Sequence, residues 1–214
     1  MHIFFIITSI LFSNTTPDPW NGYSVSNSEN LDAFTYNPAG MSINHGIESG
    51  YFFAPDNNGK ISNNSTFYYA TKSNGFGYSL KYNKGDKLFN ATDVNISFAG
   101  QINRMMNFGA NWSKENKNIS TGFLFRPASF LSIGLVTHFD EDLKEISTGR
   151  FGLGFRPFSS NLLTIGADIT YTAQEINDIT SYSPFFDITI GNGISFRSQF
   201  HTVSFDNFSF DDID

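Results

Sequence analysis

Alternation of apolar with small polar residues recurs along most of this 214-residue chain, and it constrains the possible folds more than any other feature. In LTIGADITYT, residues 163–172, the odd positions are apolar and the even positions are Thr, Gly or Asp. A period of two residues is typical of a β-strand whose two faces differ. The pattern recurs at 76–82, 94–98, 106–112, 119–126, 131–139, 149–156, 186–190 and 194–200, and less regularly near 47–54, 65–71 and 203–210. The sequence therefore predicts an all-β fold with on the order of twelve strands.

The composition of the two strand faces distinguishes a membrane protein from a soluble one. A soluble antiparallel sheet covers its wet face with Lys, Glu, Arg and Thr. Here the second face is mostly Gly, Ser, Asn, Thr and Ala, and the charges gather in the connections NKGDK, SKENKN and DEDLKE. A face of Phe, Ile, Leu, Tyr and Trp suits lipid, whereas small polar side chains suit a crowded lumen. We therefore expect an antiparallel transmembrane up-and-down β-barrel of about 12–14 strands, with a soluble secreted β-sandwich as the alternative.

Two near-copies joining neighbouring strands contain an Arg-Pro dipeptide. FRPASFLSIG occupies residues 125–134 and FRPFSSNLLTIG occupies residues 155–166. Proline presets φ for a turn and cannot join the strand ladder, so we expect a strand to end at each site. The connections near 140–148 and 174–183 are longer and polar. Short turns on one side and long loops on the other are typical of outer-membrane barrels, whose short turns face the periplasm.

The first 46 residues differ from the strands. Ile3–Phe12 is an apolar run of about ten residues, which is the length of a signal-peptide core and about half of a membrane-spanning helix. We expect residues 1–16 to be a signal peptide, with a buried N-terminal strand as the alternative. Residues 17–46 then form a plug or hatch segment, and residues 47–214 form the barrel. A barrel of roughly twelve strands has an interior that something must plug or leave open.

The segment SNSENLDAFTYNPAGMS, residues 26–42, lacks the two-residue period. Ser26 and Glu29 have the spacing of a helix capping box. A short helix is expected to run through Leu31 and Phe34. Asn37 precedes a proline and is pushed out of helical geometry, so the helix should end there. We expect a compact helix and turn that acts as the plug.

The motif Asn37-Pro38-Ala39-Gly40 resembles the signature near the mature N-terminus of FadL-type outer-membrane transporters for long-chain fatty acids and other hydrophobic compounds. It is similar as well to PorV-type barrels, which serve protein secretion, and to barrels that precede a signal-peptide-peptidase-like domain. The resemblance implies that these four residues, with Phe34 beside them, belong to a hatch in the barrel lumen. FadL transporters are longer chains with more strands, so the resemblance is close only around the motif.

No pattern typical of catalysis is found in the sequence, so we expect no enzymatic activity and no cofactor. The four histidines are scattered without a second ligand at metal spacing. The acidic run Asp140–Glu145 is expected to be a solvated loop rather than a calcium site. A net charge of −7 without a basic patch argues against nucleic acid as a partner. Asp168 and Arg197, on the small-polar face, are expected either to line the lumen or to form a structural pair.

These features predict a protein of the outer membrane of a Gram-negative-type bacterium. Its expected partners are membrane lipid and a hydrophobic small molecule, which it binds or transports in FadL-like fashion. Two alternatives keep the barrel. In one it has a structural or secretion role with secretion-system proteins as partners, and in the other it is the N-terminal barrel of a longer peptidase-type protein.

Overall fold

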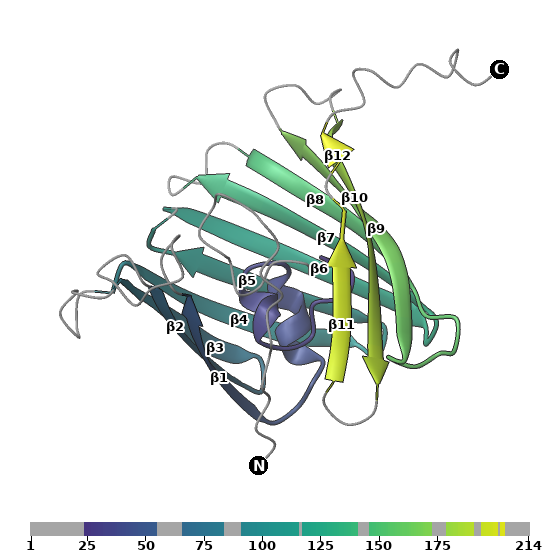
Figure 1. Ribbon diagram of the computed structural model, residues 1–214. Coiled ribbons are helices and arrows are strands. Elements are labelled where there is room, and N and C mark those ends of the chain that lie inside the picture. The colour runs from purple at the N-terminus through teal and green to yellow at the C-terminus, as the bar shows by residue number, and fades with distance from the viewer. Residues whose placement is uncertain are drawn as a thin grey trace.

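The computed structural model describes residues 24–54, 66–83, 91–115, 117–140, 146–172, 179–190, 194–200 and 202–203. All strands within these ranges belong to one sheet, in which antiparallel neighbours follow chain order from β1 to β11. The sheet curves around residues 24–44 (Figure 1). The predicted all-β, up-and-down fold is confirmed, and the alternative of a β-sandwich is wrong, because a sandwich needs two packed sheets. The predicted signal peptide, residues 1–16, lies outside the described residues.

The strands have the following bounds: β1 Ile47–Ala54, β2 Thr66–Ser73, β3 Phe76–Asn83, β4 Asp93–Asn103, β5 Met106–Ser113, β6 Asn118–Ala128, β7 Leu131–Asp140, β8 Ile146–Phe155, β9 Leu163–Thr172, β10 Ile179–Ile190, β11 Ile194–Gln199 and β12 Thr202–Val203. β12 pairs with β10 in the register that β11 has already set, because Gln199 opposes Phe185 and Thr202 opposes Tyr182. The two elements therefore form one interrupted edge strand. Eleven strands lie side by side in the described sheet.

The connections at one end of the sheet include a two-residue turn and both Arg-Pro sites. Two residues join β2 to β3, and these two, Asn74 and Gly75, both have positive φ (47° and 84°), which is the geometry of a two-residue hairpin turn. The second Arg-Pro site follows the end of β8, as predicted. At the first site the prediction is wrong, because β6 continues through Pro127 to Ala128. The register shifts there, and a bulge is where a strand tolerates proline.

The outer face of the sheet is apolar and exposed. Phe76 of β3 and Phe98 of β4 are register partners, and the centroids of their rings lie 5.2 Å apart. Outward side chains with exposed fractions between 38% and 60% include Phe98, Phe108, Leu135, Phe151, Leu153, Phe155, Ile165 and Phe196. Within the described ranges, no helix has the length and apolarity needed to cross a membrane.

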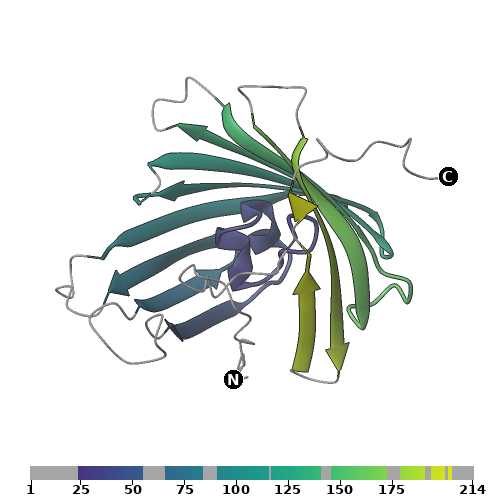
Figure 2. The same cartoon turned by 45° about the horizontal axis from the view of Figure 1, so that its top comes forward.

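The inner face is covered by the plug, which we define as residues 24–44 (Figure 2). It contains two 3-10 helices, η1 (Leu31–Phe34) and η2 (Pro38–Ser42). The predicted helix and its end before Asn37 agree with η1, although η1 is a single 3-10 turn. The predicted capping box is wrong, because the N-cap of η1 is Asn30 and makes no side-chain cap bond. The carboxylate of Glu29 has other partners, described below.

Candidate functional site: the plug and the sheet face beneath it

Asn37 links three segments of the molecule. Its backbone is extended, its Oδ1 accepts a hydrogen bond from the Ala39 N–H (3.1 Å), and Pro38 then begins η2. Its Nδ2 donates to the carbonyl of Val25 (2.7 Å) in the plug and to the carbonyl of Phe123 (3.1 Å) in β6. The side chain is fully buried, so these bonds replace water for all its polar atoms. The extended geometry follows from the proline, as the sequence predicted.

Gly40 completes the motif because nothing larger fits there. A Cβ added at Gly40 would lie 1.6 Å from the carbonyl oxygen of Ser28. Ala39 is fully buried as well, so even the small side chain of the motif contacts protein on all sides. The four residues of the motif are thus determined by packing within the plug and against the sheet.

A row of glycines on the inner face lets the plug approach the strands. Gly109 of β5 and Gly122 of β6 are register partners beneath the motif. A Cβ at Gly109 would lie 2.4 Å from the carbonyl carbon of Pro38, and one at Gly122 would lie 2.2 Å from Oδ1 of Asn37. Atoms at such distances overlap, so both positions require a hydrogen atom in place of a side chain.

Further inward-facing glycines extend this row on both sides. Gly134 of β7 and Gly152 of β8 are register partners, and a Cβ at Gly134 would lie 2.1 Å from the carbonyl oxygen of Val25. A Cβ at Gly77 of β3 would lie 2.5 Å from the ring of Phe34. We call Gly77, Gly109, Gly122, Gly134 and Gly152 the glycine floor. The sequence displayed these glycines at alternating positions, but only the plug above them reveals what they accommodate.

The two Arg-Pro repeats converge on one plug carboxylate. Oε1 of Glu29 accepts a hydrogen bond from Nη2 of Arg126 (2.5 Å) and another from Nη2 of Arg156. All three side chains are buried, with at most 17% exposed. Burial by itself would raise the pKa of Glu29, but the two positive charges outweigh it and hold that pKa below its ordinary value. We call these three residues the arginine clasp.

Sequence reasoning did not find the arginine clasp. The signal was present, because both arginines occupy the same place in two near-copies. From the sequence, that repeat indicates turn formation alone. The partner carboxylate is 97 residues away from the nearer arginine, so no local pattern could connect them.

The structure places Asp168 and Arg197 on the inner face, but it does not pair them with each other. Asp168 binds the start of the plug, because its Oδ2 accepts from the Val25 N–H (2.9 Å) and its Oδ1 accepts from the hydroxyl of Ser24. Arg197 instead donates from Nε to Oδ2 of Asp187 (2.5 Å), its register partner on β10. The alternative of an Asp168–Arg197 structural pair is therefore wrong.

Asp32 is a second buried carboxylate of the plug. Among the described residues it has no ion pair like the one that Glu29 forms with Arg126 and Arg156. Asp32 is 2% exposed, and burial raises its pKa to about 6 despite the nearby positive charge of Arg197. One of its oxygens accepts from the Asn30 N–H (3.0 Å), and the other has no hydrogen-bond partner among the described residues. Asp32 therefore takes up a proton at a higher pH than an exposed aspartate does.

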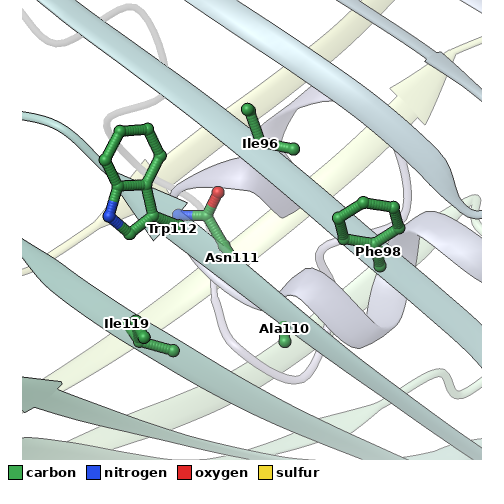
Figure 3. Close-up of a pocket in the computed structure, with 6 residues that line it drawn as sticks. All are labelled: Ile96, Phe98, Ala110, Asn111, Trp112 and Ile119. Atoms are coloured by element: carbon green, nitrogen blue, oxygen red, sulfur yellow. The ribbon is translucent and has the colours of Figure 1, made fainter. Parts of the chain in front are cut away.

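On the outer face, opposite the plug, lies an apolar depression of about 320 Å³. Its lining comes from three strands: Ile96, Phe98, Ala110, Asn111, Trp112 and Ile119 (Figure 3). The small side chain of Ala110 leaves the space between its larger neighbours. The amide of Asn111 accepts from the Ser97 hydroxyl (2.6 Å) on the inner side, so the depression itself is almost wholly apolar. Within the described residues, no group of side chains could hold a metal ion.

Comparisons with known proteins gave limited likenesses. No family model matches the chain, and no curated protein matches it. Among solved structures, a triple mutant of the Rhodopseudomonas blastica porin is similar, with a TM-score of 0.45 and 12% identity over 66% of this chain and 51% of that one. A second mutant of that porin gives a TM-score of 0.45 and 13% identity over 70% and 53%. The chain therefore spans about half the length of the porins that it matches.

Proposed function

We propose that this chain forms the wall and the plug of an outer-membrane β-barrel in a Gram-negative-type bacterium. The observation that carries the proposal is the orientation of the sheet. Large apolar side chains are exposed on the outer face of the central strands, whereas the inner face is polar and buried beneath the plug. Water does not favour so large a contiguous apolar surface on a monomer. Lipid does, and a polar interior is typical of barrels that span the outer membrane.

The lumen of this barrel is closed at rest by the plug. The glycine floor brings the plug backbone into contact with β5–β8, and the arginine clasp adds two charge-assisted bonds that are largely removed from water. We propose no catalytic reaction for the protein. Its buried Glu29, Arg126 and Arg156 pair with one another and hold the plug.

The more specific proposal is that the protein binds or transports hydrophobic small molecules in FadL-like fashion. Two observations support it. The motif at Asn37–Gly40 lies at the centre of the plug contacts, where the resemblance to FadL-type transporters implies a hatch. The apolar depression of Figure 3 opens on the lipid-facing side, where hydrophobic compounds concentrate.

A second candidate is a structural or secretion role of the PorV type. The observation that favours it is the number of separate bonds that fix the plug: through Asn37 to β6, through Asp168 to β9 and through the arginine clasp. A transporter has to release such contacts in each cycle, whereas a scaffold keeps them.

Two measurements test these proposals in turn. Membrane fractionation with urea extraction, followed by electrophoresis of boiled and unboiled samples, should give a membrane-bound protein with heat-modifiable migration. Recovery as a soluble monomer would contradict the barrel. Proteoliposomes are then loaded with a fluorescent long-chain fatty acid. The transport proposal predicts that the fatty acid leaves these vesicles faster than it leaves protein-free vesicles. The scaffold candidate predicts the same rate for both.

A further inference from the structure

The apolar depression of the outer face exists because one small residue lies among large ones. Trp112 of β5 is the register partner of Ile96 on β4 and of Ile119 on β6, so these three side chains form one row across the sheet. In the next row Ala110 opposes Phe98. Figure 3 shows the methyl group of Ala110 between Phe98 and Ile119. The lining is almost wholly hydrocarbon, so it suits an apolar chain.

In a membrane this depression is filled by hydrocarbon. A void would leave the lining atoms without partners on one side, which forfeits their dispersion contacts. Water is a poor occupant, because an ordered water needs two to four polar partners and the lining offers almost none. Apolar fit alone accepts the acyl chain of any lipid, so a preference among lipids depends on the charges at the end of the depression.

Two exposed lysines lie just beyond the depression, in the turn between β5 and β6. The backbone N–H of Lys114 donates to the carbonyl of Val94 (3.0 Å), so Lys114 continues the pairing of β5 with β4. It follows Trp112 by two residues and therefore lies on the same face, about 7 Å further along the strand. Lys117 belongs to the same turn, directly before β6. The strand end carries positive charge next to an apolar depression.

The carboxylate of the same turn does not neutralise these lysines. Both oxygens of Glu115 accept from Nζ of Lys81 on β3, at 3.0 Å and 2.9 Å. Nζ of Lys114 donates to the carbonyl of Ala91 (3.1 Å), which leaves further donors of its ammonium group for another acceptor. Among the described residues, neither Lys114 nor Lys117 forms an ion pair. An anionic group is therefore the complementary ligand.

We propose that the depression and the two lysines bind one anionic, phosphate-bearing lipid. Its acyl chain fills the depression, and its phosphate lies against Lys114 and Lys117. Trp112 lies between the two parts, and tryptophan is enriched where the hydrocarbon meets the headgroups. Lysines at that level attract anionic lipids. This inference rests on the proposed membrane location and is independent of transport.

Quenching of Trp112 fluorescence by brominated lipids tests this site. Trp20→Phe removes the other tryptophan of the chain, and the protein is reconstituted in phosphatidylcholine vesicles that contain a small fraction of one lipid with brominated acyl chains. Bromine quenches a tryptophan that it contacts. We expect brominated phosphatidylglycerol to quench Trp112 at an about fivefold lower fraction than brominated phosphatidylcholine does, because a lysine at the membrane surface favours an anionic lipid by roughly that factor.

Variants separate the contributions of charge and of shape. Lys114→Gln combined with Lys117→Gln should abolish the preference for phosphatidylglycerol while both lipids still quench Trp112. Ala110→Leu fills the depression and should reduce the preference as well. The matched control carries Phe151→Trp on the outer face of β8, together with Trp20→Phe and Trp112→Phe. Both brominated lipids should quench this control equally.

Three results would overturn the lipid site in a membrane-inserted protein. They are equal quenching of Trp112 by the two lipids, a preference that survives the two lysine substitutions, and the same preference at Phe151→Trp. Such a result leaves the membrane location intact. If fractionation instead recovers the protein outside the membrane, the lipid site falls together with the proposed function, so the two failures are distinguishable.

Discussion

The two faces of this sheet differ in what one added methyl group meets. On the inner face, a Cβ at Gly109 or Gly122 would overlap the plug, and a Cβ at Gly134 would overlap the carbonyl of Val25. On the outer face, a Cβ at Gly100 would meet no atom within 4 Å. At these positions the inner face fits the plug closely, whereas Gly100 faces open space. The outer face is apolar and is packed by its own strands at Gly149, where a Cβ would lie 2.0 Å from the ring of Tyr171.

The largest effect is expected at the arginine clasp. Glu29→Ala leaves the guanidinium groups of Arg126 and Arg156 buried without their carboxylate, and removing one partner of a buried pair costs about 3–5 kcal/mol. We expect the plug to leave the lumen, with an increase in ion conductance of the protein in planar bilayers.

The matched control for Glu29→Ala is Glu115→Ala. Glu115 also forms an ion pair, with Nζ of Lys81 at 2.9 Å, but its side chain is 39% exposed. An exposed pair is worth about 0–1 kcal/mol, so conductance and stability should stay at the level of the natural protein. Equal effects of the two substitutions would contradict a special role for the arginine clasp.

An intermediate effect is expected at the glycine floor. Gly109→Ala and Gly122→Ala force the plug away from β5 and β6, and overpacking of this kind costs about 1–3 kcal/mol. Gly100→Ala is the control on the outer face. Urea unfolding in detergent should show a lower midpoint for the two inner variants and little change for the control. If all three variants unfold alike, the plug does not pack on these strands.

The smallest effect concerns pH. The pKa of Asp32 is about 6 in the folded protein and 3.8 in its ordinary state. The folded state therefore binds more protons between these values, so protonation of Asp32 stabilises the plug as the pH falls from 7 to 5. Glu29 opposes this trend only at lower pH, because its pKa lies below 4.5.

Thiol labelling of Ser28→Cys measures this dependence. Ser28 is buried in the plug, so its labelling rate reports how often the plug opens. We expect slower labelling at pH 5 than at pH 7.5, and a smaller difference when Asp32→Asn is added. A pH dependence of undiminished size in the Asp32→Asn variant would assign the effect to another group, such as Asp168, which binds the start of the plug.

Much of the fold could be predicted because its signal is local. A period of two residues shows itself within a single strand, so the strands and the polarity of their faces were readable from the sequence alone. The signal that ends the helix before Pro38 is local as well. The capping box at Ser26 and Glu29 failed for the opposite reason. Its carboxylate is held by two arginines from distant strands, and those bonds replace a local cap.

The candidate site depends on contacts that the sequence does not display. Two arginines in near-copies and glycines at alternating positions were visible, but their common partner is a plug far away along the chain. Asp168 and Arg197 were correctly placed on the small-polar face by alternation. Their individual partners, Val25 and Asp187, follow from tertiary arrangement and could not be read from spacing.

The most direct measurement concerns two consecutive residues of β7. Leu135 points outward and is 38% exposed, whereas Val136 points inward and is 1% exposed. A nitroxide spin label is attached to a cysteine at each position in turn, in membranes, and its collisions with oxygen and with a water-soluble nickel chelate are measured. If the outer face meets lipid, the label at Leu135→Cys collides frequently with oxygen and rarely with nickel, while the label at Val136→Cys collides rarely with both. Frequent nickel collisions at Leu135→Cys would contradict a membrane-facing sheet.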